Sequence, residues 1–489
     1  MCKGLIEMGS STAVQDSQLP VVVIGAGPVG LAAAAHLLER GLEPLVLEAG
    51  DDVGAAVREW GHVRLFSPWE YDVDKAAARM LEPTGWQSPD QDALPTGEEL
   101  VAQYLAPLAA TPQLSTRIRT ATRVLAVSRD GVDKTRTVGR EGRPYLVRTV
   151  HDGQVVDLRA RAVIDASGTW GRRNPLGVAG LPAPGEEQAS PWLAGPLPDV
   201  LGIDRKRFAG RHTLVVGMGH SAANTLLALV QLREEEPATQ ITWAIRGRSP
   251  ARLYGGGDSD GLPARGLLGS TLKDAVGAGA ITLVREFSAT GLTPSEGGTG
   301  PLTVTGTARD GEEVTLAVDA IAAATGFRPD LDMLREVRLS LDPAIEAPAR
   351  LAPLIDPNFH SCGTVPAHGE DVLAHPDENF YIVGMKSYGR APTFLLATGY
   401  EQIRSIAAAL AGDFEAARRV ELALPETGVC STDLGDREAA EVGGSASCAA
   451  PVGFATGSEH GYSAEGPATT SCCGPASQVE TVGARSCGD

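Results

Sequence analysis

Three glycines near the N-terminus constrain the fold of this chain more than any other feature of its sequence. The β-branched run Val21–Ile24 is typical of a buried parallel strand. Gly25, Gly27 and Gly30 follow it in the spacing G-x-G-x-x-G. In such a turn the first glycine permits the tight bend, the second lets the backbone approach a pyrophosphate, and the third lets the helix pack on the strand. The segment therefore predicts a strand, a turn and a helix whose N-terminus faces an anion.

A helix end and an acidic residue follow at the distances that such a turn requires. Gly41 ends a helix of ordinary length, and Pro44 opens a second strand where its missing N–H does least harm. Glu48 closes this strand 23 positions after Gly25, near the separation at which a carboxylate accepts hydrogen bonds from a ribose 2′-hydroxyl. A glycine-rich turn in an unrelated α/β protein is the alternative. The strand, helix and carboxylate together favour a dinucleotide-binding βαβ unit.

The same pattern returns in the middle of the chain. A strand that begins at Thr213 leads into Gly217-x-Gly219-x-x-Ala222 and an apolar helix, which predicts a second nucleotide-binding unit. Ser221 lies inside this turn, so the stretch also resembles the G-x-S-x-G nucleophile elbow of serine hydrolases. However, alanine replaces the last glycine of that motif. Because the two glycines already account for a pyrophosphate-binding turn, we favour the nucleotide interpretation.

The second unit ends its second strand in a basic residue where the first unit has a carboxylate. Arg246 follows the predicted strand 240–245, and Arg248 lies two positions further on. An arginine at this place neutralises a 2′-phosphate, which favours NADPH over NADH. A solvated surface arginine is the alternative interpretation of Arg246.

Composition and charge narrow the classes of function. The chain has 489 residues, room for two or three domains, and its 42 Lys+Arg against 61 Asp+Glu give a net charge of −19. Without a basic stripe we expect no nucleic-acid partner. No apolar run reaches the roughly 20 residues of a membrane helix and no signal peptide is visible, so we expect no membrane partner and a cytoplasmic protein. Residues 1–19 and 425–489 lack apolar periodicity and predict a disordered lead and tail.

Small residues close two further predicted strands. The stretch 162–168 reads AVIDASG, and residues 319–323 lead into Ala324-Thr-Gly326. Small residues at a strand end let a ligand or another backbone come close. The run 380–384, FYIVG, is a later buried strand, and a helix with apolar positions at helical spacing follows before Gly412.

In their order along the chain, these parts resemble the flavoproteins with two dinucleotide-binding domains. The resemblance implies an α/β fold in which a three-layer FAD-binding Rossmann-like domain (20–175 and 315–424) carries an inserted NADPH-binding Rossmann-like domain (176–314). It implies FAD contacts at Gly25, Gly27, Gly30, Glu48, Arg64, Val124, Gly168, Gly326 and Gly384. It implies NADPH contacts at Gly217, Gly219, Ser221, Ala222, Arg246 and Arg248. For Arg64 a structural ion pair is an equal alternative to a pyrophosphate contact.

Within this group the chain resembles the class B flavin monooxygenases, through the stretches GMGHSAAN and ATGFRPD. The segment after Asn174 departs from the linker motif of typical members, because it contains no histidine. More narrowly, DASGTWGRRNPLG and IVGMKSYGRAPTFLLATGYEQ resemble the monooxygenases of arsenic-resistance operons. The resemblance implies a C4a-hydroperoxyflavin that passes one oxygen atom of dioxygen to a small-molecule substrate. By family position, the residues 67–69 and the flavin-proximal candidates Lys386, Tyr388 and Arg390 lie near the flavin. A homodimer is one possible oligomeric state.

Most of the cysteines lie near the C-terminus, and they suggest a second type of chemistry. Cys472 and Cys473 are adjacent, and Cys430 or Cys487 can supply a third thiolate. Soft thiolates suit a trivalent metalloid such as arsenic. A tail with incidental cysteines is the alternative.

Two other functions remain as competing hypotheses. An NADPH-dependent flavin reductase of the thioredoxin-reductase type shares both glycine turns, but such enzymes usually carry C-x-x-C in the nucleotide domain. Residues 176–314 contain no cysteine, which disfavours this class unless Cys472 and Cys473 act as the redox pair. The other hypothesis is a metalloid-binding flavoprotein without oxygenase activity.

Overall fold

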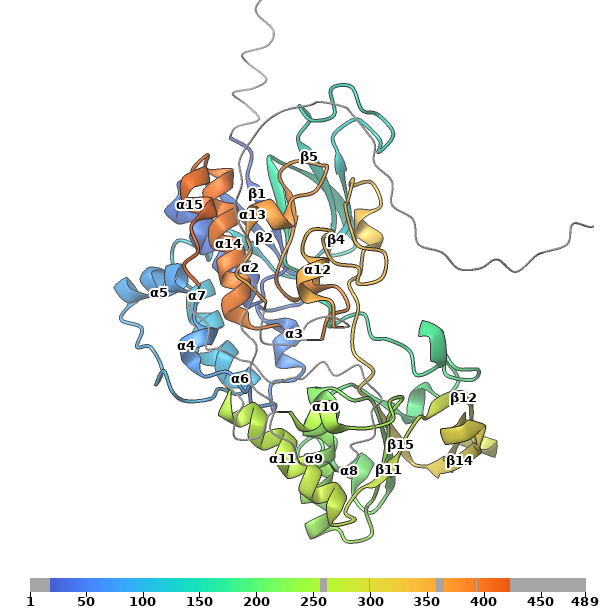
Figure 1. The fold of residues 1–489 in the computed structure, drawn as a ribbon. Coiled ribbons are helices and arrows are strands. Elements are labelled where there is room, and N and C mark those ends of the chain that lie inside the picture. The colour runs from blue at the N-terminus through green and yellow to red at the C-terminus, as the bar shows by residue number, and fades with distance from the viewer. Residues whose placement is uncertain (1–17, 256–261, 299, 358–364, 393, 423–489) are drawn as a thin grey trace, which may run out of the picture. The chain divides into compact units, whose positions relative to one another are not determined.

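The run Val21–Ile24 forms a strand, β1, with the bounds that the sequence predicts, and it is the middle strand of a parallel sheet. The structure is a computed structural model that describes residues 18–255, 262–298, 300–357, 365–392 and 394–422 (Figure 1). The first sheet has the order β16-β7-β1-β2-β3, with all neighbours parallel. Its other strands are β2 (Pro44–Leu47), β3 (Ile118–Arg119), β7 (Ala162–Asp165) and β16 (Phe380–Ile382).

Alternate residues of β1 face two different layers, because side chains in a strand point to opposite faces. Val21 and Val23 pack in the core beneath α2 (Pro28–Glu39) and α14 (Leu396–Leu410), which lie side by side (Figure 1). Val22 and Ile24 pack instead toward an antiparallel sheet of β4 (Thr122–Arg129), β5 (Tyr145–His151) and β6 (Gln154–Ala160). This arrangement of helices, parallel sheet and antiparallel sheet confirms the predicted three-layer α/β fold.

The second glycine turn belongs to a second sheet of the same design. Its strands have the order β11-β10-β9-β15-β8 and are all parallel. Val215 packs toward α9 (His220–Glu235) and α11 (Pro263–Gly277), whereas Leu214 packs toward a three-stranded antiparallel sheet. The strands of the parallel sheet are β8 (Leu193–Ala194), β9 (His212–Val216), β10 (Gln240–Ala244), β11 (Thr282–Val284) and β15 (Ala320–Ala323). Those of the antiparallel sheet are β12 (Ser288–Thr293), β13 (Leu302–Thr307) and β14 (Glu313–Val318).

The strand pairing moves one of the predicted domain boundaries. The sequence places the end of the inserted domain at residue 314, but β14 pairs with β13 and β15 pairs with β9. A boundary at 314 would therefore cut through a hairpin and remove a central strand from the second sheet. We place this boundary after β15. There the two connections between the sheets lie antiparallel, with the Asn174 N–H donating to the Gly326 carbonyl at 3.0 Å.

The remaining helices are short, and several of them pack against the long helices α2, α11 and α14. The helix after Thr96 begins with a capping box between Thr96 and Glu99, and a π-helical turn, η2 (Val101–Leu105), interrupts it. The other α-helices are α3 (Ala55–Arg58), α4 (Trp69–Asp72), α5 (Lys75–Leu81), α6 (Gly97–Leu100), α7 (Ala106–Ala109), α8 (Arg205–Phe208), α10 (Ala251–Tyr254), α12 (Ala352–Ile355), α13 (Glu370–Leu373) and α15 (Phe414–Arg418). The 3₁₀ turns are η1 (Glu82–Thr84), η3 (Val178–Gly180), η4 (Ser190–Trp192), η6 (Glu296–Gly298), η7 (Arg309–Gly311), η8 (Asp332–Leu334) and η9 (Gly384–Tyr388).

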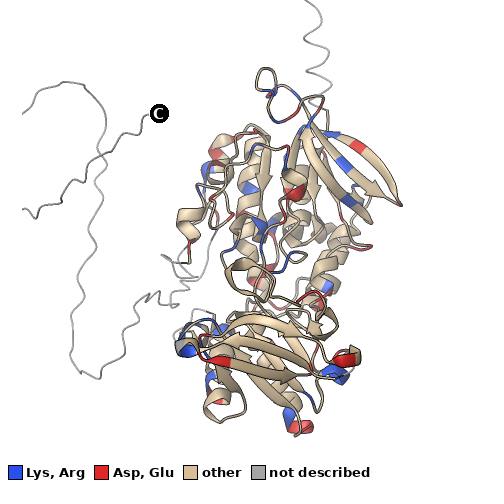
Figure 2. Ribbon diagram, turned by 90° about the vertical axis from the view of Figure 1, so that its right-hand side faces the viewer, with Lys and Arg blue, Asp and Glu red and all other residues tan. Residues whose placement is uncertain are grey.

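Charged residues of both signs are mixed over the described ribbon (Figure 2). Ion pairs account for part of this mixture, as on the outer sheet, where Arg148 of β5 pairs with Asp157 of β6 at 2.7 Å. Within the described ranges, none of the helices combines the length and the apolar character needed to cross a membrane.

Candidate nucleotide and flavin site

The first glycine turn has the geometry of a phosphate cradle. Gly25 adopts φ +101°, and a Cβ there would lie 2.8 Å from the carbonyl oxygen of Ala166. A Cβ on Gly30 would overlap the carbonyl oxygen of Gly25, so the third position also requires glycine. At Gly27 the opposite holds, because a Cβ would meet no atom within 4 Å. Gly27 caps α2 without a side-chain hydrogen bond, which leaves open space for an anion at the N-terminus of this 12-residue helix.

Glu48 lies against the glycine turn, as the βαβ prediction requires. One of its oxygens, Oε2, accepts a hydrogen bond from the backbone N–H of Ala26 at 2.7 Å. The other, Oε1, accepts from the N–H of Gly50 at 2.8 Å. Both bonds hold the half-buried carboxylate at the end of β2. This is where an adenosine ribose would lie beside a pyrophosphate at Gly27, so the residues present fit the first half of FAD.

The second glycine turn has the same design as the first. Gly217 has φ +135°, and a Cβ there would overlap the carbonyl oxygen of Ala324, just as a Cβ on Gly25 would crowd Ala166. A Cβ on Gly219 would meet no atom within 4 Å. Ala222 replaces the third glycine and is fully buried. The small residues at the ends of β7 and β15 thus have a physical cause, since each strand end lies directly under a glycine turn.

The predicted NADPH contacts beyond the turn differ in their surroundings. Arg246 is exposed at the end of β10. Arg248 is also exposed, and its Nε lies 3.0 Å from Oε1 of Glu286. Ser221 is half-buried in the first turn of α9, and its carbonyl accepts a hydrogen bond from Thr225. Arg246 and Arg248 are therefore both exposed in the loop after β10, and Arg248 is paired with Glu286.

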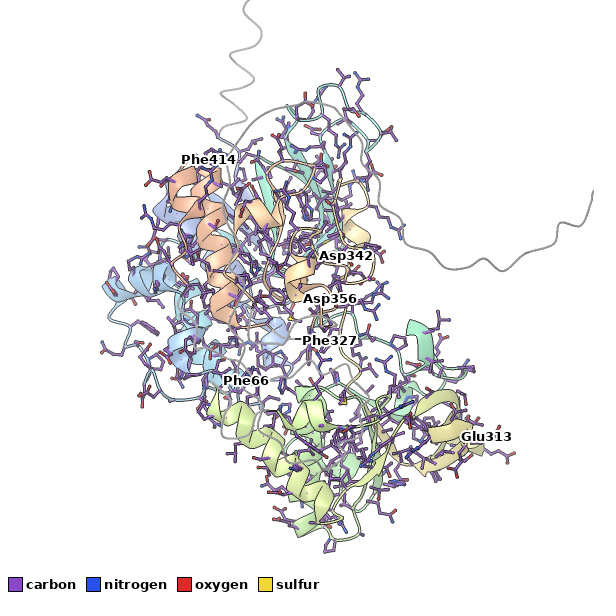
Figure 3. All side chains as sticks on the ribbon, viewed as in Figure 1. Phe66, Glu313, Phe327, Asp342, Asp356 and Phe414 are labelled. Carbon is purple, nitrogen blue, oxygen red and sulfur yellow. The ribbon has the colours of Figure 1, made fainter. Side chains whose placement is uncertain are left out.

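A cavity of about 260 Å³ opens beside the first glycine turn. Phe66, labelled in Figure 3, belongs to its wall and lies in the loop between α3 and α4. The ring of Phe66 also packs against the ring of His220, with centroids 5.1 Å apart. The other lining residues are Pro28, Val57, Trp60, Leu65, Ser67, Leu100, Phe394, Leu395 and Leu396. The wall is mostly apolar, and it includes Ser67 from the predicted flavin-proximal stretch.

The three flavin-proximal candidates of the late turn lie in different environments. Lys386 is fully buried, and its Nζ contacts Oδ2 of Asp165 at 2.6 Å and Oγ of Ser167 at 3.0 Å. Tyr388 is buried as well, and burial raises the pKa of its hydroxyl above the ordinary value. Arg390 is exposed, and its N–H donates to the carbonyl of Ile345. Lys386 thus contacts the end of β7, whereas the backbone of Arg390 is bonded to the loop that contains Ile345.

The remaining predicted FAD contacts are placed as follows. Arg64 donates to the carbonyl of Leu94 and forms an ion pair with Glu99 at 3.8 Å, which matches its alternative structural interpretation. Val124 is half-buried on β4. Gly168 and Gly326 adopt φ +69° and +85° where the chain leaves β7 and β15. Gly384 has φ +65°, and its N–H donates to the buried Gln402 at 2.8 Å.

The comparison with protein families decides the class of this protein. Residues 22–350 match the family described as pyridine nucleotide-disulphide oxidoreductase, and this stretch is more than half of the chain. The chain belongs to this family.

Solved structures resemble this family member over most of its length. Bacillithiol disulfide reductase Bdr from Bacillus cereus aligns with a TM-score of 0.58 and 23% identity, covering 81% of this chain and 99% of that one. A flavin monooxygenase from Stenotrophomonas maltophilia, in a doubly mutated form, aligns with a TM-score of 0.51 and 25% identity, covering 80% and 98%. The ornithine N-hydroxylase of Kutzneria sp. 744 aligns with a TM-score of 0.54 and 16% identity, covering 81% and 99%.

One curated relative matches a shorter stretch. Thiamine thiazole synthase from Archaeoglobus fulgidus is 30% identical over 177 residues, which is 34% of this chain. The chain spans 62% of the length of that relative.

Membership of the pyridine nucleotide-disulphide oxidoreductase family confirms several predictions from the sequence. It confirms the resemblance to flavoproteins with two dinucleotide-binding domains and the class of a flavin-dependent oxidoreductase that uses a pyridine nucleotide. FAD and NAD(P)H are therefore the cofactors, as predicted. The family accounts for both glycine turns as nucleotide sites, so we do not retain the serine-hydrolase interpretation of the turn at Ser221.

Sequence reasoning missed two buried carboxylates near the first turn. Asp165 pairs with Lys386, and its sequence signal is a charged residue inside the apolar run AVIDASG. Asp72 is fully buried behind the cavity wall and accepts a hydrogen bond from Ser67 at 2.8 Å. No pattern in the sequence distinguishes Asp72 from the acidic residues around it, because its burial arises from the packing of α4 against α14.

The predicted metalloid ligands Cys430, Cys472 and Cys473, and the alternative Cys487, lie outside the described residues, as do residues 1–17 of the predicted lead and the whole predicted tail, 425–489. Among the residues that the structure does describe, no group of three or more His, Cys, Asp and Glu side chains is placed to hold a metal ion.

Proposed function

We propose that this chain is an FAD-dependent monooxygenase that takes its electrons from NADPH and uses dioxygen on a small-molecule substrate. The observation that carries this proposal is the mostly apolar cavity beside the first glycine turn. A reaction that activates oxygen needs a site from which bulk water is excluded. A dithiol reductase needs two cysteines at the flavin instead, and the sequence has no cysteine between positions 3 and 361.

The residues of the chain have distinct tasks in this proposal. Gly27 and the N-terminus of α2 bind the pyrophosphate of FAD, and Glu48 accepts from its ribose. Bound FAD supplies the redox chemistry with nicotinamide and dioxygen. Trp60, Phe66 and the other apolar residues of the wall keep water out. Lys386 contributes a buried positive charge at the end of β7, balanced by Asp165.

The likeness to bacillithiol disulfide reductase makes a disulfide reductase the competing function, and rapid mixing separates the two. We expect the NADPH-reduced enzyme, mixed with oxygen, to pass through an absorbance transient that differs from both the reduced and the oxidised flavin spectra. With the right substrate, one oxygen molecule should disappear per NADPH without release of hydrogen peroxide. Direct reoxidation without a transient, together with NADPH-dependent reduction of a disulfide, would support the reductase instead.

We propose a trivalent arsenic compound as the substrate class, because DASGTWGRRNPLG and the adjacent Cys472 and Cys473 both point to arsenic chemistry. The expected result is that arsenite or a trivalent organoarsenical raises NADPH oxidation and lowers peroxide release. A deletion of residues 425–489 serves as the matched control. Oxidation that survives this deletion would contradict a function as a metalloid-binding protein only, whereas oxidation that no arsenic compound stimulates would contradict the arsenic proposal.

Arg246→Ala should weaken the binding of NADPH far more than that of NADH. A charge-assisted contact to a phosphate contributes about 1.5–3 kcal/mol, so we expect the Kd for NADPH to rise about tenfold to hundredfold. Titration of the enzyme with each nucleotide measures both Kd values. Arg205→Ala is the control, because Arg205 lies on α8 and pairs with Glu235 at 2.9 Å. An equal loss of affinity for NADPH and NADH would show that Arg246 does not contact the 2′-phosphate.

Glu286→Gln tests the same site by a change that should raise the affinity for NADPH. Glu286 adopts φ +54° and holds its carboxylate within 3.0 Å of Arg248 and 3.9 Å of Arg309. A 2′-phosphate at Arg248 would compete with that carboxylate for the guanidinium group, so neutralising Glu286 should tighten NADPH binding and leave NADH binding unchanged. Isothermal titration with both nucleotides measures this effect. A parallel change for NADH and NADPH would show that Glu286 does not act on the phosphate.

A further inference from the structure

A buried carboxylate lies directly behind the cavity wall and has one oxygen without a partner. Asp72 ends α4 and is fully buried. Its Oδ1 accepts a hydrogen bond from Oγ of Ser67 at 2.8 Å, whereas Oδ2 has no hydrogen-bond partner in the described structure. Ser67 is itself 5% exposed and lines the cavity. Ser67 therefore connects the Asp72 carboxyl to the cavity wall through one hydrogen bond.

The other groups around Asp72 do not neutralise its charge. The hydroxyl of Tyr400 on α14 donates to the backbone carbonyl of Asp72 at 2.7 Å, not to its side chain. Asp74, two residues further on, already binds His36 of α2 at 2.9 Å and caps α5 through the N–H of Ala77. The hydroxyl of Tyr104 accepts from the N–H of Asp74 at 3.1 Å.

This environment favours the neutral form of Asp72. Burial raises the pKa of the Asp72 carboxyl to about 7, and the hydrogen bond from Ser67 opposes this shift only in part. The carboxyl is therefore protonated below neutral pH and ionised above it. Neither Tyr104 nor Tyr400 ionises in this range, because burial raises the pKa of both hydroxyls well above the ordinary value.

The two forms of Asp72 impose different roles on Ser67. An ionised Asp72 accepts the hydroxyl proton of Ser67, so that only the lone pairs of Oγ face the cavity. A protonated Asp72 can donate its own proton to Oγ, which frees the Ser67 hydroxyl to donate into the cavity. We propose that Asp72 is a positioning residue that switches Ser67 between hydrogen-bond acceptor and donor toward the group bound in the cavity. This inference deepens the proposed function and rests on it for the identity of that group, the flavin ring.

The titration itself can be measured by infrared difference spectroscopy of the purified FAD-containing enzyme between pH 5 and pH 9, about two pH units on either side of the expected pKa. We expect a protonated carboxylic acid band that disappears around pH 7 and is missing in Asp72→Asn. In Ser67→Ala the band should persist to higher pH, because that variant loses the hydrogen bond that stabilises the ionised form. Asp92→Asn, an exposed residue in the following loop, is the control and should leave the band unchanged.

The effect on the cavity is read from the visible absorbance of bound flavin over the same pH range. The spectrum should shift with the Asp72 titration in the wild-type enzyme and in Asp92→Asn, but not in Ser67→Ala or Asp72→Asn. The proposal would be overturned if the carboxylic acid band were still present in Asp72→Asn, or if the flavin spectrum of the wild-type enzyme did not change over the pH range of the titration. If the carboxyl titrates as expected but the protein binds no FAD, the proposed function and the switch toward flavin are both wrong. The infrared result would still assign the titration to Asp72.

Discussion

Gly27→Leu should give a folded protein that purifies without FAD, whereas Gly219→Leu should give a yellow protein that no longer binds NADPH. Both glycines cap helices of 12 and 16 residues, and a Cβ at either position would meet no protein atom within 4 Å. A leucine therefore does not disturb the chain itself. It fills the space through which a pyrophosphate must approach the helix N-terminus, where the contact depends on backbone N–H groups.

Each variant is the control for the other. The ratio of flavin absorbance to protein absorbance measures FAD content, and isothermal titration measures NADPH binding whether or not a variant retains its flavin. Circular dichroism checks that both proteins are folded. A Gly27→Leu protein that retains FAD would contradict the first site, and a Gly219→Leu protein that loses FAD but keeps NADPH binding would reverse the assignment of the two cofactors.

Lys386→Met should lower the free energy of unfolding by about 3–5 kcal/mol, because it leaves the carboxylate of Asp165 buried without its partner. Both side chains of this pair have 0% exposure, and their atoms lie 2.6 Å apart. Removing one member of such a pair costs much more than removing both, since the remaining charge stays buried without its counter-ion and Asp165 keeps only the hydrogen bonds from Ser167. Denaturant unfolding of the FAD-loaded enzyme measures the difference.

The double variant Lys386→Met with Asp165→Asn tests the reason for that loss. It should recover a large part of the stability, because no uncompensated charge remains. Arg148→Met is a matched control, since Arg148 pairs with Asp157 at 2.7 Å on an exposed face and such surface pairs contribute only about 0–1 kcal/mol. A single Lys386 variant as stable as the Arg148 variant would show that the buried pair is not maintained in solution.

The nucleotide-binding units could be predicted from the sequence because their constraints are local. Gly25 and Gly217 need positive φ, and the hydrophobic strands before them need burial on both faces. These requirements act over a few residues, so the pattern of glycines and apolar positions shows them directly. The bounds of β1 and β2 agree with the predicted strands to within about one residue for the same reason.

The boundary of the second sheet and the buried groups of the site could not be predicted from the sequence, because they depend on contacts between distant segments. The sequence of β15 is equally suited to either sheet, and only its pairing with β9 decides that it belongs to the second. Lys386 meets Asp165 across 221 positions of the chain, and Asp72 is buried because α14 packs on α4.

The sequence by itself thus determined the fold class and the two cofactors, through turns whose steric demands are visible in single residue types. Only the tertiary structure decided which ionisable groups surround the cavity. The charge of a side chain such as Asp72 depends on how much water its neighbours exclude, and that is set by packing between segments rather than by neighbours in the chain.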